Sequence, residues 1–421
     1  MNKEYLRNVI TDQYEDLKGV LDTLLRDDLK NINSFVKNPA ISIISGVRRC
    51  GKSTLLEQII NLYYKDDFYY FDFSDERISK FTTEDFQLLY ETFLEKFGKR
   101  KAFFFDEIQG LPNWNKFVNR MKKIGYKCFV TGSNSNMLSK ELSTYLTGRH
   151  IDKTLFPFSF KEYLRYKNIK IDLDSTKTKT KIIREFKNYF KCGGFPEVVI
   201  ANDTSILLNI YSDIVSKDII ERFKIKDISL FKDFCNYVIS LSTNEFTYKS
   251  LKDNFNIKNI TTISNYIDYL KLTYLIFEVK RFSSSLQKLN KYSKKFYCID
   301  NGLLNKIGFG YSIGEPRFLE NQVFIELWRN NPKSNFYYYR DKDNKECDFL
   351  VLNNRKVVKA LQVCYAFKKA DTRKREIEGL LSALNKFNLD YGEIITYEYK
   401  EKIEINGKTI EMIPIYEWLL K

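Results

Sequence analysis

One segment of the chain combines the residue types that bind phosphate groups, in a spacing suited to that chemistry. The string GVRRCGKS fits the pattern G-x-x-x-x-G-K-[ST] in full. Gly46 and Gly51 would let the backbone turn tightly and point N–H groups at phosphate oxygens, and the helix that follows adds the positive end of its dipole. Lys52 would supply a mobile positive charge for the β- and γ-phosphates, and the Ser53 hydroxyl would be a ligand for Mg²⁺. Thr54 is a further donor to the phosphates.

Two acidic residues after an apolar run could supply the second half of such a site. Residues 101–105 read as a short buried strand, and Asp106 and Glu107 follow it directly. Asp106 would hold Mg²⁺ directly or through water, and Glu107 would orient and polarise the attacking water. An acidic pair is common in turns, so its position after the phosphate loop is what gives it weight.

A third polar group follows the strand pattern at residues 127–130. Ser133 and Asn134 would lie at the same sheet edge, where a polar side chain could reach the γ-phosphate or the water. The alternative is that they cap a helix beginning near Met137. The sequence does not decide between the two.

The elements that must position these residues alternate between strand and helix patterns. Apolar strand patterns at residues 41–44, 68–73, 101–105 and 127–130 are separated by stretches with helical spacing. This alternation predicts a parallel sheet in an α/β domain. The predicted cofactors are ATP and Mg²⁺.

Composition excludes several classes of protein. The seven cysteines are scattered with no C-x-x-C pair, and His150 is the single histidine, which argues against a disulfide framework and against multi-histidine metal sites. There is no apolar signal-like segment and no apolar stretch of membrane length, so we expect a cytoplasmic protein with no membrane partner. The 69 Lys and Arg against 54 Asp and Glu give a net charge of +15. That balance fits a protein that meets nucleic acid, or a general bias in composition.

The motifs GVRRCGKST, FFFDEIQ, VTGSNSNML, LTGRH and FPFSFKEYL, in this order, resemble a family of prokaryotic P-loop ATPases of the AAA+ superfamily that usually end in a domain of unknown function. The resemblance covers nearly the whole chain. It implies an AAA+ core in which Lys52 and Ser53 form the Walker A motif and Asp106 and Glu107 the Walker B motif.

The resemblance also implies roles for residues after the third strand. Ser133 or Asn134 would be sensor 1, and Arg149 falls where such proteins place an arginine finger. A finger stabilises charge on a neighbour's nucleotide, so it requires a homo-oligomer. The alternative is a surface arginine after a helix that ends at Gly148. The expected partners are ATP or ADP and further copies of this chain.

The predicted fold class is α/β, with four domains along the chain. They are a P-loop AAA+ core, a helical lid, a winged-helix-like domain and a C-terminal restriction-endonuclease-like α/β domain, at residues 1–155, 156–227, 228–312 and 313–421. Residues 279–299 contain six Lys or Arg and no acid. A flexible basic hairpin there would contact the phosphates of double-stranded DNA, or it would be a solvated loop for solubility or subunit contacts.

The C-terminal domain departs from an active nuclease pattern. Glu320 and Asp348 match the first two metal ligands of that fold, but Gln362 and Cys364 stand where a carboxylate and a lysine would be needed. We therefore expect a binding or assembly module. The sequence favours an oligomeric Mg²⁺-dependent ATPase that couples nucleotide state to the binding of DNA or a partner protein. Two alternatives stay open: a nucleotide-gated protein scaffold with slow hydrolysis and no role at DNA, and a residual nuclease.

Overall fold

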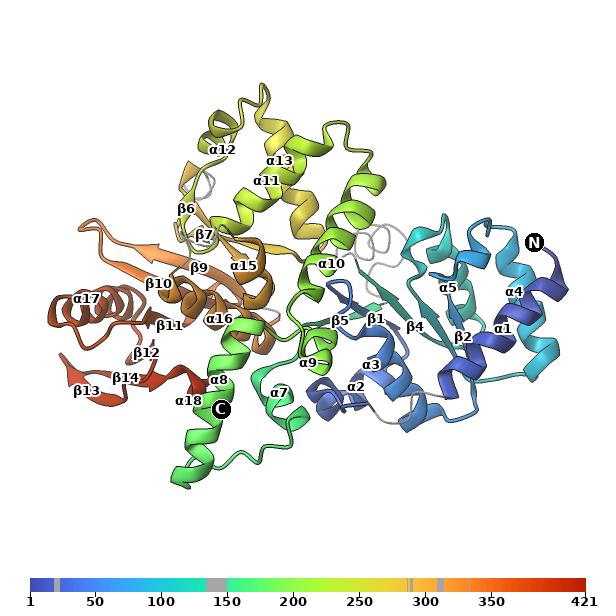
Figure 1. Ribbon diagram of the computed structural model, residues 1–421, viewed down its shortest axis with the longest axis horizontal. Helices are drawn as coiled ribbons and strands as arrows, with labels where there is room; N and C mark the ends of the chain where they lie inside the picture. Colours follow the sequence, from blue (N-terminus) through green and yellow to red (C-terminus); the bar gives the residue numbers. More distant parts are fainter. Residues whose placement is uncertain (19–22, 134–149, 286, 288–290, 309–313, 333) are drawn as a thin grey trace. The chain divides into compact units, whose positions relative to one another are not determined.

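The chain divides into two units in a computed structural model of residues 1–421, which describes all residues except 19–22, 134–149, 286, 288–290, 309–313 and 333 (Figure 1). The first unit comprises Met1–Phe156 and the short segment Leu272–Tyr274, and the second comprises Pro157–Lys271 and Leu275–Lys421. Within the described ranges, every helix is too short or too polar to span a lipid bilayer.

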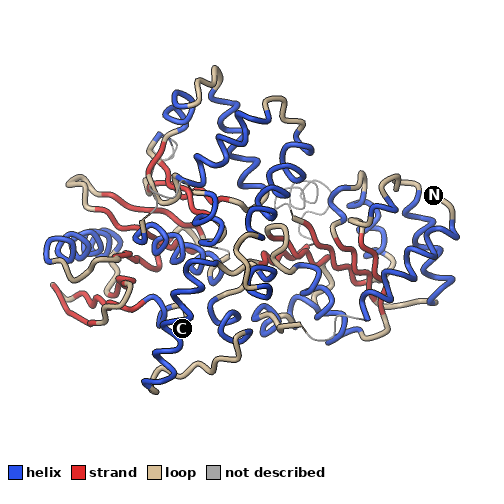
Figure 2. The backbone as a smooth tube through the Cα atoms, in the orientation of Figure 1, coloured by secondary structure: helices blue, strands red, loops and turns tan. Residues whose placement is uncertain are grey.

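A five-stranded parallel sheet forms the centre of the first unit, which confirms the predicted α/β fold class (Figure 2). Its strands, in spatial order, are β2 (Phe68–Asp72), β3 (Ala102–Asp106), β4 (Lys127–Gly132), β1 (Ile41–Gly46) and β5 (His150–Leu155). Every residue of β1 and β3 is buried, which explains why they read as continuous apolar runs. The edge strand β5 reads HIDKTL and lacks such a run, so it was not predicted.

Helices cover both faces of this sheet. One face packs against α1 (Lys3–Lys18), α4 (Asp85–Phe97) and α5 (Trp114–Lys123), which bury their apolar side chains against Phe103 and Phe105 of β3. The other face packs against α3 (Lys52–Ile59), α2 (Asn33–Lys37) and the π-helical turn Ile60–Tyr64 that continues α3. Rings of Phe104 and Phe129 stack there with centroids 4.6 Å apart.

Parallel pairing gives the two edges of the sheet different roles. The carboxyl ends of β1, β3 and β4 meet at one edge, where the phosphate loop and the acidic pair follow β1 and β3. The amino ends of the same three strands meet at the opposite edge. The phosphate loop at one edge is therefore separated from the opposite edge by the length of the strands.

The second unit begins with helices. They are α7 (Phe160–Tyr166), α8 (Thr176–Cys192), α9 (Pro196–Ala201), α10 (Ile206–Asp213) with its π-helical extension Ile214–Glu221, α11 (Ile228–Ser240), α12 (Tyr248–Asn254) and α13 (Ile260–Leu272). The pair α12 and α13 lies within residues 228–312, the range predicted as a winged-helix-like domain.

A nine-stranded mixed sheet fills the rest of the second unit. Its spatial order is β13 (Glu401–Ile405), β14 (Lys408–Pro414), β12 (Tyr391–Thr396), β11 (Lys356–Cys364), β10 (Glu346–Asn353), β9 (Asn335–Arg340), β7 (Ile276–Arg281), β8 (Lys294–Cys298) and β6 (Glu245–Phe246). The antiparallel pair β7 and β8, predicted as a wing, joins the C-terminal strands because β7 pairs in parallel with β9. The boundary predicted between residues 312 and 313 therefore falls within one sheet.

Within the described residues, further helices of this unit are α15 (Asn301–Ile307), α16 (Glu315–Asn330), α17 (Ala370–Phe387) and α18 (Ile415–Trp418). Helix α17 approaches β10 very closely at Gly379. A Cβ added to Gly379 would lie 2.0 Å from the carbonyl oxygen of Glu346. The absence of a side chain at this position thus sets how closely the helix packs on the sheet.

Gly379→Ala should destabilise the second unit, because the added methyl group would force α17 away from β10. Overpacking of this kind costs about 1–3 kcal/mol. The midpoint of thermal unfolding, followed by circular dichroism, should fall. Gly110→Ala is the control, since nothing lies within 4 Å of its added Cβ. Equal midpoints in the two variants would contradict this packing.

Candidate functional site

The phosphate loop connects β1 to α3 at the carboxyl edge of the first unit's sheet. Gly46 has φ = 152°, and a Cβ there would lie 2.3 Å from the carbonyl oxygen of Leu155. Gly51 has φ = 97° and forms the N-cap of α3. Both positions favour glycine, one for close approach and the other for its left-handed backbone. The loop ends at a helix N-terminus, where the helix dipole favours an anion.

Lys52, the first residue of α3, points into this loop, and only 4% of its side chain is exposed. Its Nζ lies 3.2 Å from Oε1 of Glu107 and donates to the carbonyl oxygen of Val47 at 3.3 Å. Burial by itself would lower the pKa of Lys52, but the nearby carboxylates, Glu107 foremost, outweigh it and raise the pKa above its ordinary value. The ammonium is therefore charged and held by an acid.

Asp106 ends β3 and is buried. Its carboxyl group accepts hydrogen bonds from the hydroxyls of Thr131 and Ser53. Burial, together with the charges of Glu107 and Asp72, raises the pKa of Asp106 to about 6. A carboxylate in this setting is stabilised by a cation close by.

The donor set at Asp106 fits Mg²⁺. The ion prefers hard oxygen ligands, and it usually takes one or two carboxylates while water and substrate phosphates complete its shell. The Ser53 hydroxyl beside the Asp106 carboxyl offers two such oxygens. Among the described residues, no group of three or more His, Cys, Asp or Glu could hold a metal ion. The arrangement thus suits an ion bound together with phosphate rather than a cage of protein ligands.

Glu107 is fixed by its backbone and by its side chain. It adopts a left-handed conformation with φ = 48°, and its N–H donates to Oγ1 of Thr131 at 2.9 Å. The Gln109 amide donates to its carboxylate. Burial would raise the pKa of Glu107, but Lys52, Gln109 and Arg48 lower it below its ordinary value. The site therefore holds an ionised carboxylate in a defined position.

Two positioning residues, Thr131 and Gln109, were not predicted. The Thr131 hydroxyl contacts both acids, because it donates to Asp106 and accepts from the N–H of Glu107. The Gln109 amide nitrogen lies 3.5 Å from Oγ of the buried Ser133. The available signals were that Thr131 ends the third strand pattern and that Gln109 lies two residues after Glu107, but neither is specific.

The remaining predicted site residues divide into two groups. Ser53 and Thr54 lie in the first turn of α3, and Ser133 follows β4, so the structure brings these beside the phosphate loop and the acidic pair. Asn134 and Arg149 lie outside the described residues. Their proposed contacts with nucleotide stay predictions.

Arg26 is a buried residue that the sequence did not single out. Its guanidinium donates to the carbonyl oxygen of Cys50 at 2.8 Å and to that of Phe156 at 2.6 Å. Its backbone N–H donates to the Gln58 side chain of α3 at 3.3 Å. Arg26 therefore connects the N-terminal segment, the phosphate loop and the residue that follows β5.

Tyr274 gives the phosphate loop a second long-range support. Its hydroxyl donates to Oγ of Ser45, the residue before Gly46, at 2.7 Å. Ser45 Oγ also lies 3.3 Å from Oγ1 of Thr154 in β5. Because Tyr274 follows α13 directly in the chain, the segment between α13 and β7 contacts the strand that carries the loop.

The basic segment 279–299 is not a freely solvated hairpin throughout. Lys294 and Lys295 lie in β8 with 8% and 5% of their surface exposed. Arg281 stacks on the ring of Tyr292 at 4.6 Å and donates to the carbonyl oxygen of Arg340. Lys291 is exposed, whereas Lys288 lies outside the described residues. Two of the six cations in this segment are therefore buried in a strand, and the contact of the segment with DNA stays a prediction.

Lys295 lies at the centre of an acidic cluster in the second unit. Its Nζ lies 3.0 Å from Glu320, 2.8 Å from Glu346 and 3.4 Å from Asp348. The hydroxyl of Tyr297 also donates to Glu320, at 2.7 Å. Burial would lower the pKa of Lys295, but the carboxylates raise it well above its ordinary value. The two acids matched to a nuclease pattern are thus neutralised by an internal ammonium.

The other two positions of that pattern have structural contacts. Gln362 accepts a hydrogen bond from the N–H of Asp348 at 3.0 Å and donates to Glu376. Cys364 is buried, and burial raises the pKa of its thiol to about 12. The ammonium that lies beside Glu320 and Asp348 belongs to Lys295 of β8, whereas Gln362 and Cys364 lie in β11.

Comparison with known proteins gives three family matches along the chain. Residues 38–164 match an AAA domain, residues 183–312 a domain of unknown function (DUF8612) and residues 317–418 a second one (DUF4143).

Two relatives match over most of their length. The uncharacterized protein MJ1544 of Methanocaldococcus jannaschii is 38% identical over 397 residues, 90% of this chain and 88% of that protein. An uncharacterized protein of Haemophilus influenzae is 31% identical over 419 residues, 93% of this chain and 97% of that protein. Among solved structures, the S. cerevisiae Hsp104–ADP complex matches with 12% identity and a TM-score of 0.32, covering 62% of this chain and 40% of that one.

Lys295→Met should strongly destabilise the second unit, because it leaves Glu320 and Asp348 without the Lys295 ammonium, whereas Glu346 keeps its pair with Arg340. Removing one partner of a buried ion pair costs about 3–5 kcal/mol. The loss of stability should be larger at pH 8 than at pH 5, because at pH 5 the carboxyl groups left without Lys295 can take up protons. Lys291→Met, an exposed lysine of the same segment, is the control for thermal unfolding at both pH values. A midpoint equal to that of the control at pH 8 would refute the role of Lys295.

Proposed function

The chain belongs to a family of AAA-domain proteins that includes MJ1544 of Methanocaldococcus jannaschii and the Haemophilus influenzae relative, and from this premise we propose that it is an Mg²⁺-dependent ATPase. The AAA domain makes it a nucleotide-binding, ATPase-like protein. The observation that carries the proposal is the contact of Lys52 with Glu107 at 3.2 Å. It brings a phosphate-binding lysine and an ionised acid together beside the glycine loop.

ATP binding would release Glu107 for catalysis. The β- and γ-phosphates would lie at the N-terminus of α3 and replace Glu107 as the partner of the Lys52 ammonium. Glu107 would stay ionised and oriented, because Gln109 and Thr131 hold it independently of Lys52. Its carboxylate is then free to accept a hydrogen bond from water and to take the water's proton.

The other loop residues would hold the substrate. Backbone N–H groups between Gly46 and Gly51 would bind phosphate oxygens, and Thr54 would be a further donor. Ser53 and Asp106 would hold Mg²⁺ through hydroxyl and carboxyl oxygens. When bound, the ion neutralises charge that develops on the transferred phosphoryl group.

Hydrolysis would be completed in a homo-oligomer. Asn134 would orient the attacking water, and Arg149 of one copy would reach the nucleotide of the next. Support for this step comes from the position of LTGRH after the P-loop motifs. Nucleotide state would then control binding of DNA or of a partner protein in the cytoplasm.

A nucleotide-gated scaffold that binds proteins is the second candidate. The burial of Lys294 and Lys295 favours it, since it weakens the case for a DNA contact through residues 279–299. A nuclease is disfavoured, because the Lys295 ammonium already neutralises Glu320 and Asp348. Loss of DNA binding on Lys280→Glu with Lys291→Glu would favour the DNA contact over the scaffold.

Lys52→Ala should lose both ATP binding and turnover, because the phosphates lose their cation. Glu107→Gln should lower turnover by about 100-fold or more. It should bind ATP at least as tightly as the parent, because glutamine competes less well for Lys52. Isothermal titration calorimetry with ATP and Mg²⁺ and a phosphate-release assay measure the two properties. Lys123→Ala, an exposed lysine of α5, is the control. Hydrolysis retained in both variants would disprove the assignment.

Arg149→Ala should lower turnover by about 1,000-fold or more while ATP still binds. If the arginine acts on a neighbour, mixing Arg149→Ala with Lys52→Ala should restore activity. The mixed oligomer contains sites that have Lys52 from one copy and Arg149 from the other. The phosphate-release rate of the mixture, compared with that of each variant alone, is the measurement. No recovery in mixtures shown to co-assemble would exclude a finger acting between copies.

A further inference from the structure

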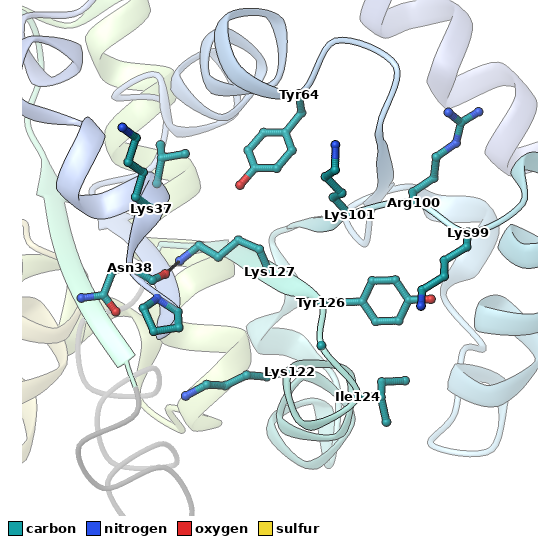
Figure 3. Close-up of a pocket in the computed structure, with 13 residues that line it drawn as sticks. Lys37, Asn38, Tyr64, Lys99, Arg100, Lys101, Lys122, Ile124, Tyr126 and Lys127 are labelled. Atoms are coloured by element: carbon teal, nitrogen blue, oxygen red, sulfur yellow. Dashed lines mark hydrogen bonds between the residues drawn. The ribbon is translucent and has the colours of Figure 1, made fainter.

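A basic groove lies at the amino-terminal edge of the first unit's sheet, opposite the phosphate loop (Figure 3). It encloses about 610 Å³. The cations that line it lie at the start of three neighbouring strands or in the segments that lead into them: Lys99, Arg100 and Lys101 before β3, Lys122 in α5 before β4, Lys127 at the start of β4, and Lys37 in α2 before β1. Because β3, β4 and β1 are neighbours in the sheet, these residues form a row across its edge.

The lining of this groove is basic, and none of its lining residues is Asp or Glu. Lys101 pairs with Asp67 at 2.7 Å, and the Lys101 side chain is still 81% exposed. Lys37 and Lys99 are exposed as well. Like charges held together in this way favour a multivalent anion.

Lys127 shows the same excess of charge at the floor of the groove. Its ammonium donates to the carbonyl oxygens of Asn38 and Ala40 and to the Ser42 hydroxyl, all of which are neutral. Burial, with the charge of Lys122 adding to it, lowers the pKa of Lys127 to about 8. The Nε of Arg100 is buried and has no hydrogen-bond partner. Negative charge bound in the groove would stabilise the charged form of Lys127.

The cations are spread along the groove rather than aimed at one point. In Figure 3, Lys37, Lys101 and Arg100 extend upward at separate places, whereas Lys122 extends toward the lower left. Three neighbouring strands span about 10 Å, at about 4.8 Å per interstrand step. On each strand of a duplex, successive phosphates are about 3.4 Å apart when measured along the helix axis, so two or three of them match this row. One inorganic phosphate would need converging donors.

We propose that this groove binds the phosphate backbone of a nucleic acid. A membrane surface fits less well, because membrane adsorption needs apolar side chains beside the basic ones. Ile124 is the large apolar side chain that is well exposed there, at 51%. The Tyr64 ring packs edge-on against Phe104 and Phe129 and leaves its hydroxyl toward the groove, as a donor rather than a stacking surface. Recognition would therefore be salt-dependent and tolerant of sequence.

This binding site does not rest on the proposed ATPase activity. It lies at the other edge of the sheet, and none of its residues belongs to the phosphate loop or the acidic pair. A Lys52→Ala protein that no longer binds ATP should still bind nucleic acid. The two proposals can thus fail separately.

The test is fluorescence anisotropy of the full chain with a labelled DNA duplex and with a labelled single strand, between about 50 and 200 mM salt. The groove variant is Lys37→Glu, Lys99→Glu, Lys101→Glu. It should weaken binding at least tenfold and reduce the slope of log affinity against log salt by about one per lysine removed. The control, Lys30→Glu, Lys65→Glu, Lys80→Glu, has the same net charge and changes exposed residues of the same unit.

Additional measurements control for unfolding of the variants and for binding of other anions. ATP binding reports whether each variant is folded. If the triple variant unfolds, the double variant Lys37→Ala, Lys99→Ala takes its place, because it keeps the Lys101–Asp67 pair. This double variant should weaken nucleic-acid binding several-fold. Inorganic phosphate and phosphatidylserine vesicles are offered in place of nucleic acid. The proposal is overturned if the groove and control variants weaken equally, if the parent binds neither nucleic acid, or if vesicles bind in a groove-dependent way while nucleic acid does not.

Discussion

The ion pair between Lys52 and Glu107 is the interaction on which the rest of the candidate site depends. A lysine side chain that is 4% exposed requires a negative partner, and Glu107, the residue that follows β3, provides it. The contact holds the glycine loop against the carboxyl end of β3. The pair also keeps both groups ionised, since each moves the pKa of the other in the direction that favours charge. Arg26 and Tyr274 then support the loop from elsewhere in the unit.

The second unit also contains a buried lysine with acidic partners, but in a different position in the fold. Lys295 is also buried among carboxylates, but it lies within a strand, β8, which is flanked by β7 and by the short edge strand β6. Lys52 instead follows a glycine loop at a sheet edge, where a phosphate can approach. An exchangeable ion pair therefore accompanies the phosphate loop, whereas the Lys295 cluster is part of the core. Fold position, and not the residue types alone, distinguishes a candidate catalytic pair from a structural one.

Local patterns predicted what depends on local sequence. Strand, glycine loop and helix around Lys52 follow from adjacent residues, and Asp106 was placed correctly at the end of β3. Arg26 and Thr131 could not be predicted in their positions, because their partners are brought near only by the fold, over 130 residues in the case of Arg26 and Phe156. The nine-stranded sheet was missed for the same reason: β7 and β9 pair across a long connection. Lys295 stood out as a basic residue, but its acidic partners lie on other elements.

The net charge of +15 illustrates why composition cannot identify a surface. Some of the basic residues are buried inside the protein. Lys52, Lys295 and Arg26 contact carboxylates or carbonyl oxygens there. Such cations are cancelled at short range and attract no distant anion. The row at the amino edge of the first sheet is different, because Lys37, Lys99 and Lys101 are exposed and no Asp or Glu lines the groove. A parallel sheet thereby gives one unit two anion-attracting edges: a glycine loop for a compact phosphate group, and a row of lysines for an extended one.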